Sequence, residues 1–579
     1  EIYTLSLHDA LPISREMLTF QGREKGTAKV LILDNDTTQS LAVAYSQSEI
    51  LDYDVFLTEK LGAAHEDMKH LIAIVFVRPS DANIKLLCAE LKKPKYGEYH
   101  IYFTNICRVD NIQELAQADE NSLVKEVHEF FGDYIPIDSD HYSLNLTDGL
   151  QLCRAPSQWK ETENTLFHRA TDSLVAACLA LKQRPYIRYQ SSSESAARLA
   201  RELLHQIERE DQRGTLFDYR GNCQLVIMDR KSDPVTPLLM QWLYLGMVHE
   251  FMPITNNRVR ITDNGKDEEF VLNPQTDDFL KVHKWDNFGD LCDAAKQQTN
   301  EFAAADKRQE ELKRSDMASF VENFKDYKLL ELSAKRHVSL VSELGRIVRA
   351  HGLTTISALE QSLACNNDSV GQYKELMHLI EDPNTAKEDL IRLAVLYALH
   401  YEQKPGSKLS SIISALRDRG VSDDMISVIQ KFLKFSPSEG RTGDLYGSSG
   451  LGGLVSGIAK SIKGNNSIYT QHQPLLQDVL TQVKKGKLSE GDYPYEGASG
   501  SGAPNMVIVF YVGGTTYEEA HVVSQWNEEG SMQVVLGGTH VLNSDMFMRG
   551  IRSMSGRSEE HTSELQSLED LVCRLLLEK

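Results

Sequence analysis

Residues 506–538 read MVIVFYVGGTTYEEAHVVSQWNEEGSMQVVLGG. The unbroken apolar run at 506–512 is typical of a strand that is buried on both faces, and a second such run lies at 532–538. The segment between them, 516–526, has the length and polarity of a connecting helix. This β-α-β pattern predicts a parallel sheet with helices packed against it.

A unit of the same kind begins much earlier in the chain, near residue 143. Helical patterns at 165–182 and 193–209 precede a buried strand, QLVIMD, at 224–229, and an apolar helix is expected at 237–251. The sequence that follows reads as largely helical. We therefore expect one α/β domain that is interrupted by a helical insertion and completed by residues 506–538.

Another α/β unit precedes this domain. Strands are expected at 29–34, 54–57, 71–79 and 99–106, helices at 81–91 and 111–130, and the stretch YIPI at 134–137 is expected to close the unit. Strands that alternate with helices favour a parallel sheet with helices on both faces.

The insertion contains a long helical pattern at 317–348, which indicates one face of a long helix or a helical hairpin. Further helices are expected at 389–402 and 408–432. The Gly- and Ser-rich stretch at 436–464 is interpreted as a mobile loop. The apolar positions of the long pattern are Phe320, Phe324, Tyr327, Leu330, Ala334, Val338, Val341, Leu344 and Val348.

The two ends of the chain resemble sequencing-library adapters when they are back-translated, so we interpret residues 1–14 and 557–579 as artefacts. The alternative for the second segment is a natural amphipathic helix lined by Leu571, Leu575 and Leu576. The predicted domains are a first α/β domain at 15–142, a second α/β domain in two parts at 143–251 and 477–556, and a helical domain at 252–476.

Composition narrows the class of protein. The formal net charge is -21, which argues against a broad nucleic-acid surface. No run of 18 apolar residues is present, so no membrane span is expected. Apart from Cys573 in the adapter-like tail, the cysteines are dispersed without a CxxC spacing, which fits free thiols in the cytosol rather than a zinc site.

One motif suggests an enzyme. LILDNDTT at 31–38 is similar to the first motif of Mg²⁺-dependent phosphohydrolases, in which Asp34 would attack phosphorus and Asp36 would exchange protons with the leaving group. Asp229 and Asp233 could supply the later metal-binding acids. The favoured interpretation is structural, because Asp and Thr commonly cap a helix that follows a strand.

Two further motifs have ordinary explanations. HEDMKH at 65–70 resembles a zinc-protease motif, but His65 and His70 are five residues apart and do not share a helix face, so a solvated helix is expected. VGGTT at 512–516 could hold an anion at a helix N-terminus, although a tight turn is the commoner explanation. The chain contains no GK[ST] ending of a phosphate-binding loop and no GxSxG elbow.

Several segments, in order, are similar to signature segments of the SM (Sec/Munc-like, syntaxin-binding) family. They are PKYGEYHIYFTNI (94–106), RPYIRYQSSSESAARLA (184–200), LVIMDRKSDPVTPLLMQWLYLGMVHEF (225–251), RLAVLYALHYE (392–402), and YTQHQPLL (469–476) followed by YPY (493–495) and VGGTTYEEA (512–520). The resemblance implies an arch-shaped α/β plus α fold, in which two parallel-sheet α/β domains carry a large, mainly helical inserted domain.

The resemblance also implies a function without chemistry. It points to a regulator or chaperone of SNARE complex assembly that binds a syntaxin in vesicle docking and fusion at the endosome and trans-Golgi. Such a protein needs no cofactor or metal and is expected to be a cytoplasmic monomer, held at Golgi and endosomal membranes by its partners. A generic helical scaffold for membrane tethers is the other non-enzymatic alternative.

The family's site for the syntaxin N-terminal peptide matches the segment at 103–130, expected as strand, helix and helix. The implied peptide-binding positions are Ile106, Cys107, Ile112, Leu115, Val124 and Glu129. The apolar residues of this set would form a hollow for a Leu or Phe side chain of the peptide, and Glu129 would pair with a basic peptide residue. A second implied surface, for SNARE helices, includes Val338, Val341 and Leu344. From spacing alone, the favoured interpretation of the peptide-binding set is that its apolar residues pack their helices against the sheet, and the alternative for the SNARE-helix set is again buried core.

Overall fold

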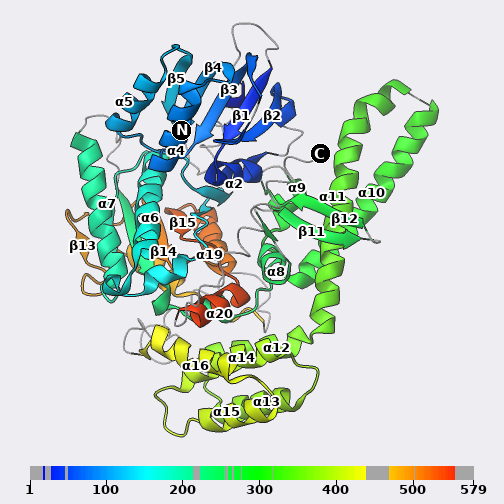
Figure 1. The fold of residues 1–579 in the computed structure, drawn as a ribbon. Helices are drawn as coiled ribbons and strands as arrows, with labels where there is room; N and C mark the ends of the chain where they lie inside the picture. Colours follow the sequence, from blue (N-terminus) through cyan, green and yellow to red (C-terminus); the bar gives the residue numbers. More distant parts are fainter. Residues whose placement is uncertain are drawn as a thin grey trace.

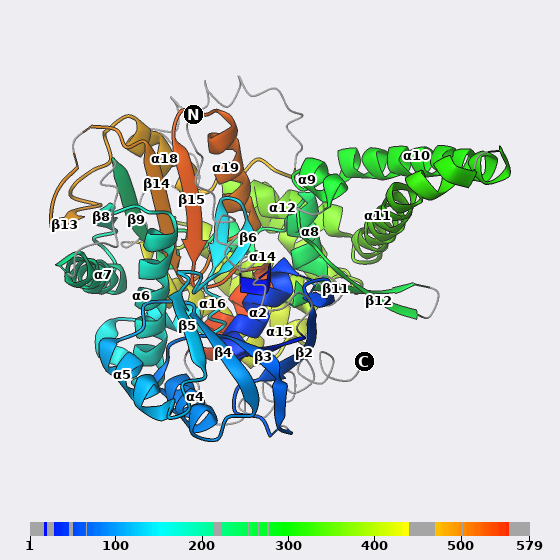
Figure 2. The same ribbon diagram turned by 90° about the horizontal axis from the view of Figure 1, so that it is seen from above.

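The computed structural model describes residues 17–19, 28–45, 50–64, 66–212, 222–252, 254–255, 258–263, 266–274, 277–315, 317–438, 469–500 and 502–554. Both adapter-like segments and most of the Gly- and Ser-rich stretch lie outside the described residues. The molecule is an arch (Figures 1 and 2): the first α/β domain and a long helical hairpin form its two arms, and the second α/β domain and a group of helices join them.

The first domain is built on a parallel sheet with the strand order β2-β1-β3-β4-β5. Apolar residues of α4 and α5 cover one face of this sheet, and α2 covers the other. The elements are β1 (Lys29–Leu33), α2 (Asn35–Ala44), β2 (Val55–Lys60), β3 (Met68–Val77), α4 (Asp81–Lys92), β4 (Tyr96–Phe103), α5 (Val109–Ala118) and β5 (Val124–Glu129).

The helix expected at 111–130 was wrong in its second half, which forms the edge strand β5. Helix α5 ends at Ala118, and the carboxylate of Asp119 then accepts the backbone N–H groups of Leu123 and Val124 at 2.8 and 2.9 Å. This turn, with Ser122 at a φ of 54°, redirects the chain before the alternating sequence VKEVHE.

The solvated helix expected around HEDMKH was also wrong. Met68, Lys69 and His70 begin strand β3, whose interior residues are apolar and buried. His65 lies outside the described residues. The long apolar continuation of the strand decides the conformation of its polar beginning.

The second sheet has the order β13-β8-β9-β14-β15-β7-β6, and β14 lies between β9 and β15. The prediction that residues after the insertion complete this sheet is therefore confirmed. Its elements are β6 (Ile135–Asp138), β7 (His141–Ser143), α6 (Glu161–Ala180), β8 (Tyr186–Tyr189), α7 (Glu194–Gln212), β9 (Cys223–Asp229), α18 (Leu475–Lys484), β13 (Tyr495–Glu496), β14 (Met506–Val512), α19 (Tyr517–Glu528), β15 (Gln533–Gly538) and α20 (Ser544–Ser553).

We expected the stretch YIPI to close the first sheet, and this expectation was wrong. Residues 135–137 lie in β6, which pairs with β7 at the edge of the second sheet. The sheet topology thus places the change of domain near Asp133 rather than at residue 142. Short strands such as these are assigned to a sheet by their pairing partners, and a single sequence does not display those partners.

The inserted domain is mainly helical, and the long pattern at 317–348 lies in a single helix, α11. The stretch expected as one helix at 408–432 is two, because Gly420 takes a φ of 77° and Ser422 caps the second. The helices are α8 (Tyr244–Phe251), α9 (Asp278–His283), α10 (Phe288–Ser315), α11 (Met317–Ala350), α12 (Leu353–Cys365), α13 (Ser369–Glu381), α14 (Lys387–Tyr401), α15 (Leu409–Asp418) and α16 (Asp423–Phe435).

A small antiparallel sheet in this domain was not predicted. It consists of β10 (Ile254–Thr255), β11 (Arg258–Asp263) and β12 (Lys266–Val271). The dipeptide Asn264-Gly265 between two alternating stretches was the available sequence signal for a hairpin. None of the helices that the structure describes is long and apolar enough to cross a membrane.

Candidate functional site

Asp34, the first acid of the LILDNDTT motif, is a structural cap. One carboxylate oxygen accepts the backbone N–H and the hydroxyl of Thr37 at 2.7 and 2.8 Å. The other accepts the backbone N–H of Arg78 at 2.7 Å and the side-chain amide of Asn83 at 2.6 Å. Both oxygens therefore tie α2 to the end of β3 and the start of α4, which favours the capping interpretation over a phosphate-attacking nucleophile.

Of the other acids in the phosphohydrolase hypothesis, Asp36 lies close enough to Asp34 for its charge to raise the pKa of Asp34, but Asp229 and Asp233 bond within the second domain. Asp36 lies 3.7 Å from Arg169 of α6. Asp229 accepts the hydroxyl of Ser193 at 2.6 Å in the second domain, and Asp233 caps a turn there. Among the described residues, no three His, Cys, Asp or Glu side chains are grouped so that they could hold a metal ion.

The VGGTT segment is a tight turn. Gly513 and Gly514 have φ angles of 93° and 99°, and a Cβ on Gly513 would lie 2.4 Å from the sulfur of Cys153. The N-terminus of α19 that follows is capped by Thr516 and Glu519, which bond to each other's backbone N–H groups. These internal caps already satisfy the N–H groups that an anion would need.

The implied peptide-binding residues lie on α5, β5 and the loop that joins β4 to α5. Cys107 and Leu115 are 6% and 5% exposed and belong to the core of the first domain. Val124 is half-buried against the same core. Ile112 is 36% exposed and is the accessible apolar side chain of the set.

Ile106 lies differently from the other five residues, because it packs against the core cluster that contains the second domain. Glu129, at the end of β5, accepts the backbone N–H of Cys107 at 2.8 Å. Burial raises the pKa of Glu129, and the nearby carboxylate of Glu210 on α7 raises it further. Ile106 and Glu129 therefore lie beside the second domain.

Two accessible apolar residues near this set were missed from the sequence. Val109, at the start of α5, is 58% exposed, and Val127, on the edge strand β5, is 42% exposed. In sequence, Val109 is two residues from Cys107 and Val127 is two residues from Glu129. Val127 lies within the segment expected as a helix at 111–130, so the alternation of side chains along β5 was not considered.

The residues expected to contact SNARE helices lie at the base of the α10–α11 hairpin. Leu344 is fully buried, Val341 is 9% exposed, and Val338 is partly buried against the main core. Because these three side chains are largely buried, a contact surface for SNARE helices on α11 would have to use other, exposed residues of this helix. Among the side chains of α11 that the structure describes, the large apolar ones that are exposed are Met317, Val321, Phe324, Leu329 and Leu332, toward the free end of the hairpin.

Leu329 and Leu332 line a groove of about 930 Å³ between α11, α9, α10 and the small β-sheet. Acidic residues such as Asp277, Glu301 and Asp326 share its walls with Arg258 and Arg336. An apolar strip beside mixed charge is the kind of surface on which an amphipathic helix binds.

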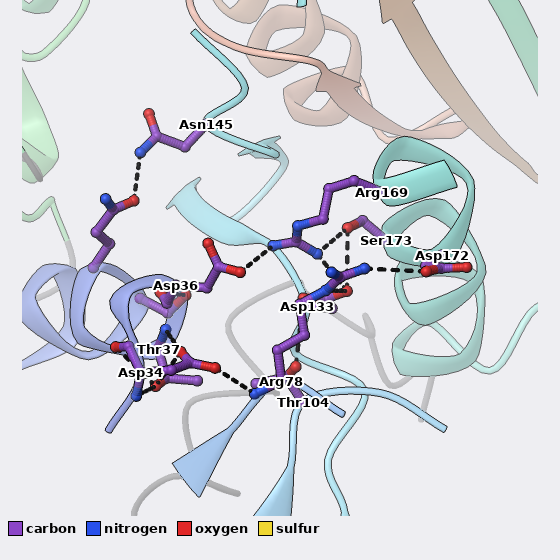
Figure 3. Close-up of polar contacts among 12 residues, drawn as sticks. Asp34, Asp36, Thr37, Arg78, Thr104, Asp133, Asn145, Arg169, Asp172 and Ser173 are labelled. Atoms are coloured by element: carbon purple, nitrogen blue, oxygen red, sulfur yellow. Dashed lines mark hydrogen bonds and ion pairs between the residues drawn. The ribbon is translucent and has the colours of Figure 1, made fainter. Parts of the chain in front are cut away.

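A polar cluster joins the first domain to the second (Figure 3). Asp133 is 2% exposed and receives hydrogen bonds or ion pairs from both domains, including Arg169 of α6 at 2.5 Å and Arg78 at the end of β3 at 3.2 Å. Burial alone would raise the pKa of Asp133, but Arg169 and Arg78 outweigh it and hold the pKa below its ordinary value. The cluster is therefore ionised and structural.

Comparison with known proteins agrees with this architecture. Residues 29–550 match the model of the Sec1 family. The chain is 37% identical to the vacuolar protein sorting-associated protein 45 homolog of Arabidopsis thaliana, over 92% of this chain and 96% of the relative. It is also 37% identical to vacuolar protein sorting-associated protein 45 of Homo sapiens, over 93% of this chain and 96% of that protein.

A solved structure, the SM protein Vps45 in complex with the Qa SNARE Tlg2 (1–310), superposes with a TM-score of 0.84 at 35% identity, covering 95% of this chain and 98% of that chain. The fold thus defines an arch-shaped protein of the SM class. The chain belongs to the Sec1 family, which confirms the resemblance seen in its sequence motifs.

Proposed function

We propose that this protein regulates SNARE assembly by binding a Qa SNARE of the syntaxin type, and that it does so by templating rather than by catalysis. The observation that carries the proposal is the fold and 35% identity that it shares with an SM protein solved in complex with Tlg2. The capped, inward-bonded Asp34 supports the non-enzymatic reading. By analogy, the site of action is the endosome and trans-Golgi, with membrane attachment through the bound partner.

The proposed peptide site is the outer surface of α5 and β5. Val109 and Ile112 offer exposed apolar contacts, with Cys107, Leu115 and Val124 beneath them. Glu129 is held in place by the N–H of Cys107, so it can face a basic peptide residue without reorganising. Peptides that bind such sites use one or two apolar anchors and a charge.

The first test is calorimetric titration of the full chain with a synthetic N-terminal peptide of Tlg2, beside the Ile112→Arg variant. Ile112 is preferred to Leu115, because a charge at the 5%-exposed Leu115 would disturb the core of the domain. We expect saturable binding that Ile112→Arg weakens at least about tenfold, since the charge faces the apolar anchor.

The control is Val370→Arg, at an apolar position on α13 that is 63% exposed, against 36% for Ile112, and this variant should bind like the unmodified chain. Binding that survives Ile112→Arg would move the site elsewhere. If the chain binds neither the peptide nor the Tlg2 fragment 1–310 that is present in the known complex, the proposal is rejected and the general helical scaffold is favoured.

The proposed second contact uses the exposed face of α11. Val321, Phe324, Leu329 and Leu332 would lie against a SNARE helix, while Leu344 and its neighbours hold the base of the hairpin in the core. Phe302 and Tyr327 stack across the hairpin, with ring centroids 5.9 Å apart, and keep α10 and α11 together beneath this surface. A rigid two-helix arm suits the alignment of other helices.

A further inference from the structure

The Asp133 cluster lies directly behind the proposed peptide site. Asp133 is in the short segment between β5 and β6, where the chain passes from the first sheet to the second. From the first domain it is bonded by Arg78, Thr104 and Asn105, and from α6 of the second domain by Arg169 and Ser173. Five donors from two domains thus meet on one buried carboxylate, and Figure 3 shows Arg78, Thr104, Arg169 and Ser173 of this set around Asp133.

Asn105 connects this cluster to the peptide site. Its side-chain NH₂ donates to Asp133 at 3.2 Å and to the backbone carbonyl of Asp172 on α6 at 2.9 Å. Its side-chain oxygen accepts the backbone N–H of Ile106 at 2.8 Å. The next residue, Cys107, is a wall of the peptide site and is fixed by Glu129.

The packing of Ile106 and Cys107 also links the two domains at the peptide site. Ile106 lies against the core cluster of the second domain, whereas Cys107 lies in the core of the first. Two consecutive residues are therefore held by different domains. A shift of the first domain relative to α6 would move Ile106 and Asn105 and distort the wall formed by Cys107.

We propose that the Asp133 cluster couples peptide occupancy to the placement of the first domain on the second, with Asn105 and Asp133 as positioning residues of the peptide site. This inference rests on the proposed function. Because coupling is reciprocal, a peptide that orders residues 106–107 also tightens the junction. The first domain is one arm of the arch (Figure 1), so binding on its outer face stiffens the arm that stands opposite the α10–α11 hairpin.

The test compares the unmodified full chain with Asp133→Asn, which removes the charge at nearly constant size, and with Asn105→Ala. Affinity for the Tlg2 N-terminal peptide is measured by calorimetry. Hydrogen exchange at residues 130–134 and 169–173, which are outside the peptide site, is measured with and without peptide. We expect the peptide to slow exchange there in the unmodified chain, and both variants to bind about tenfold more weakly and to lose that protection.

The matched control is Asp36→Asn. Asp36 contacts Arg169 from the half-exposed side of the cluster at 3.7 Å, whereas the side chain of Asn105 bonds to Asp133, Asp172 and Ile106, so loss of the Asp36 charge should leave affinity and protection unchanged. If Asp133→Asn does not fold, Asn105→Ala decides the outcome alone.

Unchanged affinity together with unchanged protection in a folded variant would overturn the coupling while leaving the proposed function intact. If the unmodified chain binds no peptide, the proposed function fails first and the coupling fails with it. Weaker binding with the protection retained would make the two residues merely structural supports of the site and would also overturn the proposal.

Discussion

At the scale of single residues, one ion pair closes the interrupted second domain. Arg230 follows β9, before the insertion, and Glu519 lies on α19, after it. The two side chains are completely buried, with contacts of 2.7 and 2.8 Å, and the guanidinium also donates to the carbonyl of Gly514. The ring of Tyr511 lies over the guanidinium, 4.2 Å away.

We predict that Glu519→Gln destabilises the protein by about 3–5 kcal/mol, because it leaves the guanidinium of Arg230 buried without a counter-charge. Urea unfolding at neutral pH, followed by circular dichroism, measures this change in the free energy of unfolding.

The matched control is Glu518→Gln at the adjacent position. Burial and the neighbouring Glu519 raise the pKa of Glu518 to about 7, so this carboxyl is already partly protonated and its amide should cost little. Equal effects of the two substitutions would show that the ion pair contributes nothing specific.

At the scale of elements, α11 separates a buried base from an exposed end. The helical spacing of apolar residues predicted one face of α11, and residues on this face, including Ala334, Val341 and Leu344, are buried. The spacing identifies buried residues because packing against a core requires apolar side chains on one side of a helix. Val321, Leu329 and Leu332 fall outside that stripe and are exposed. Apolar residues outside the helical pattern were thus one signal for exposed apolar surface, whereas most of the pattern indicated the core, although Phe324, which belongs to the pattern, is 41% exposed.

We predict opposite consequences for truncating the two kinds of position. Leu344→Ala should destabilise the protein by about 2–5 kcal/mol, since it opens a cavity in a fully buried site. Val321→Ala, at a position that is 66% exposed, should change stability by less than about 0.5 kcal/mol. Thermal and urea unfolding of both variants checks this, and a large loss for Val321→Ala would mean that α11 is packed there.

The sequence predicted the buried strands well because an apolar run such as 506–512 has few alternative conformations in a soluble protein. It predicted β5 poorly, since the apolar residues Val124 and Val127 are three apart and fit a helix as readily as a strand. The turn at Asp119 and the pairing with β4 decide the conformation, and the pairing is a long-range contact. The candidate peptide-binding residues thus lie partly on a strand, β5, where a helix was expected.

At the scale of the whole molecule, the arch depends on contacts that join distant parts of the chain. Arg188 donates to the carbonyls of Leu488, Ser489 and Tyr493, about three hundred residues away, and β14 fills the centre of the second sheet between β9 and β15. The insertion therefore leaves from and returns to one rigid base. That base carries both arms of the arch (Figure 1).

His141 and His540 are buried and His249 is partly buried, and the rings of His141 and His249 lie 6.1 and 5.2 Å from the ring of Tyr517. Burial lowers the pKa of His141 and His249 to about 4 and that of His540 to about 3. In the unfolded chain the pKa is about 6.5. Their contribution to stability is therefore fully present above pH 6.5 and is lost as the pH falls toward 4.

The pH profile of the unmodified protein does not isolate this effect, because Glu360 and Glu518 have pKa values raised to about 7 and act in the opposite direction below that pH. The difference between the unmodified chain and His540→Gln cancels the carboxyl contributions. We predict that this difference in the free energy of unfolding shifts in favour of the variant by about 1.4 kcal/mol for each pH unit between 6 and 4. Urea unfolding at pH 6, 5 and 4 measures it, and parallel profiles would show that folding does not lower the pKa of His540.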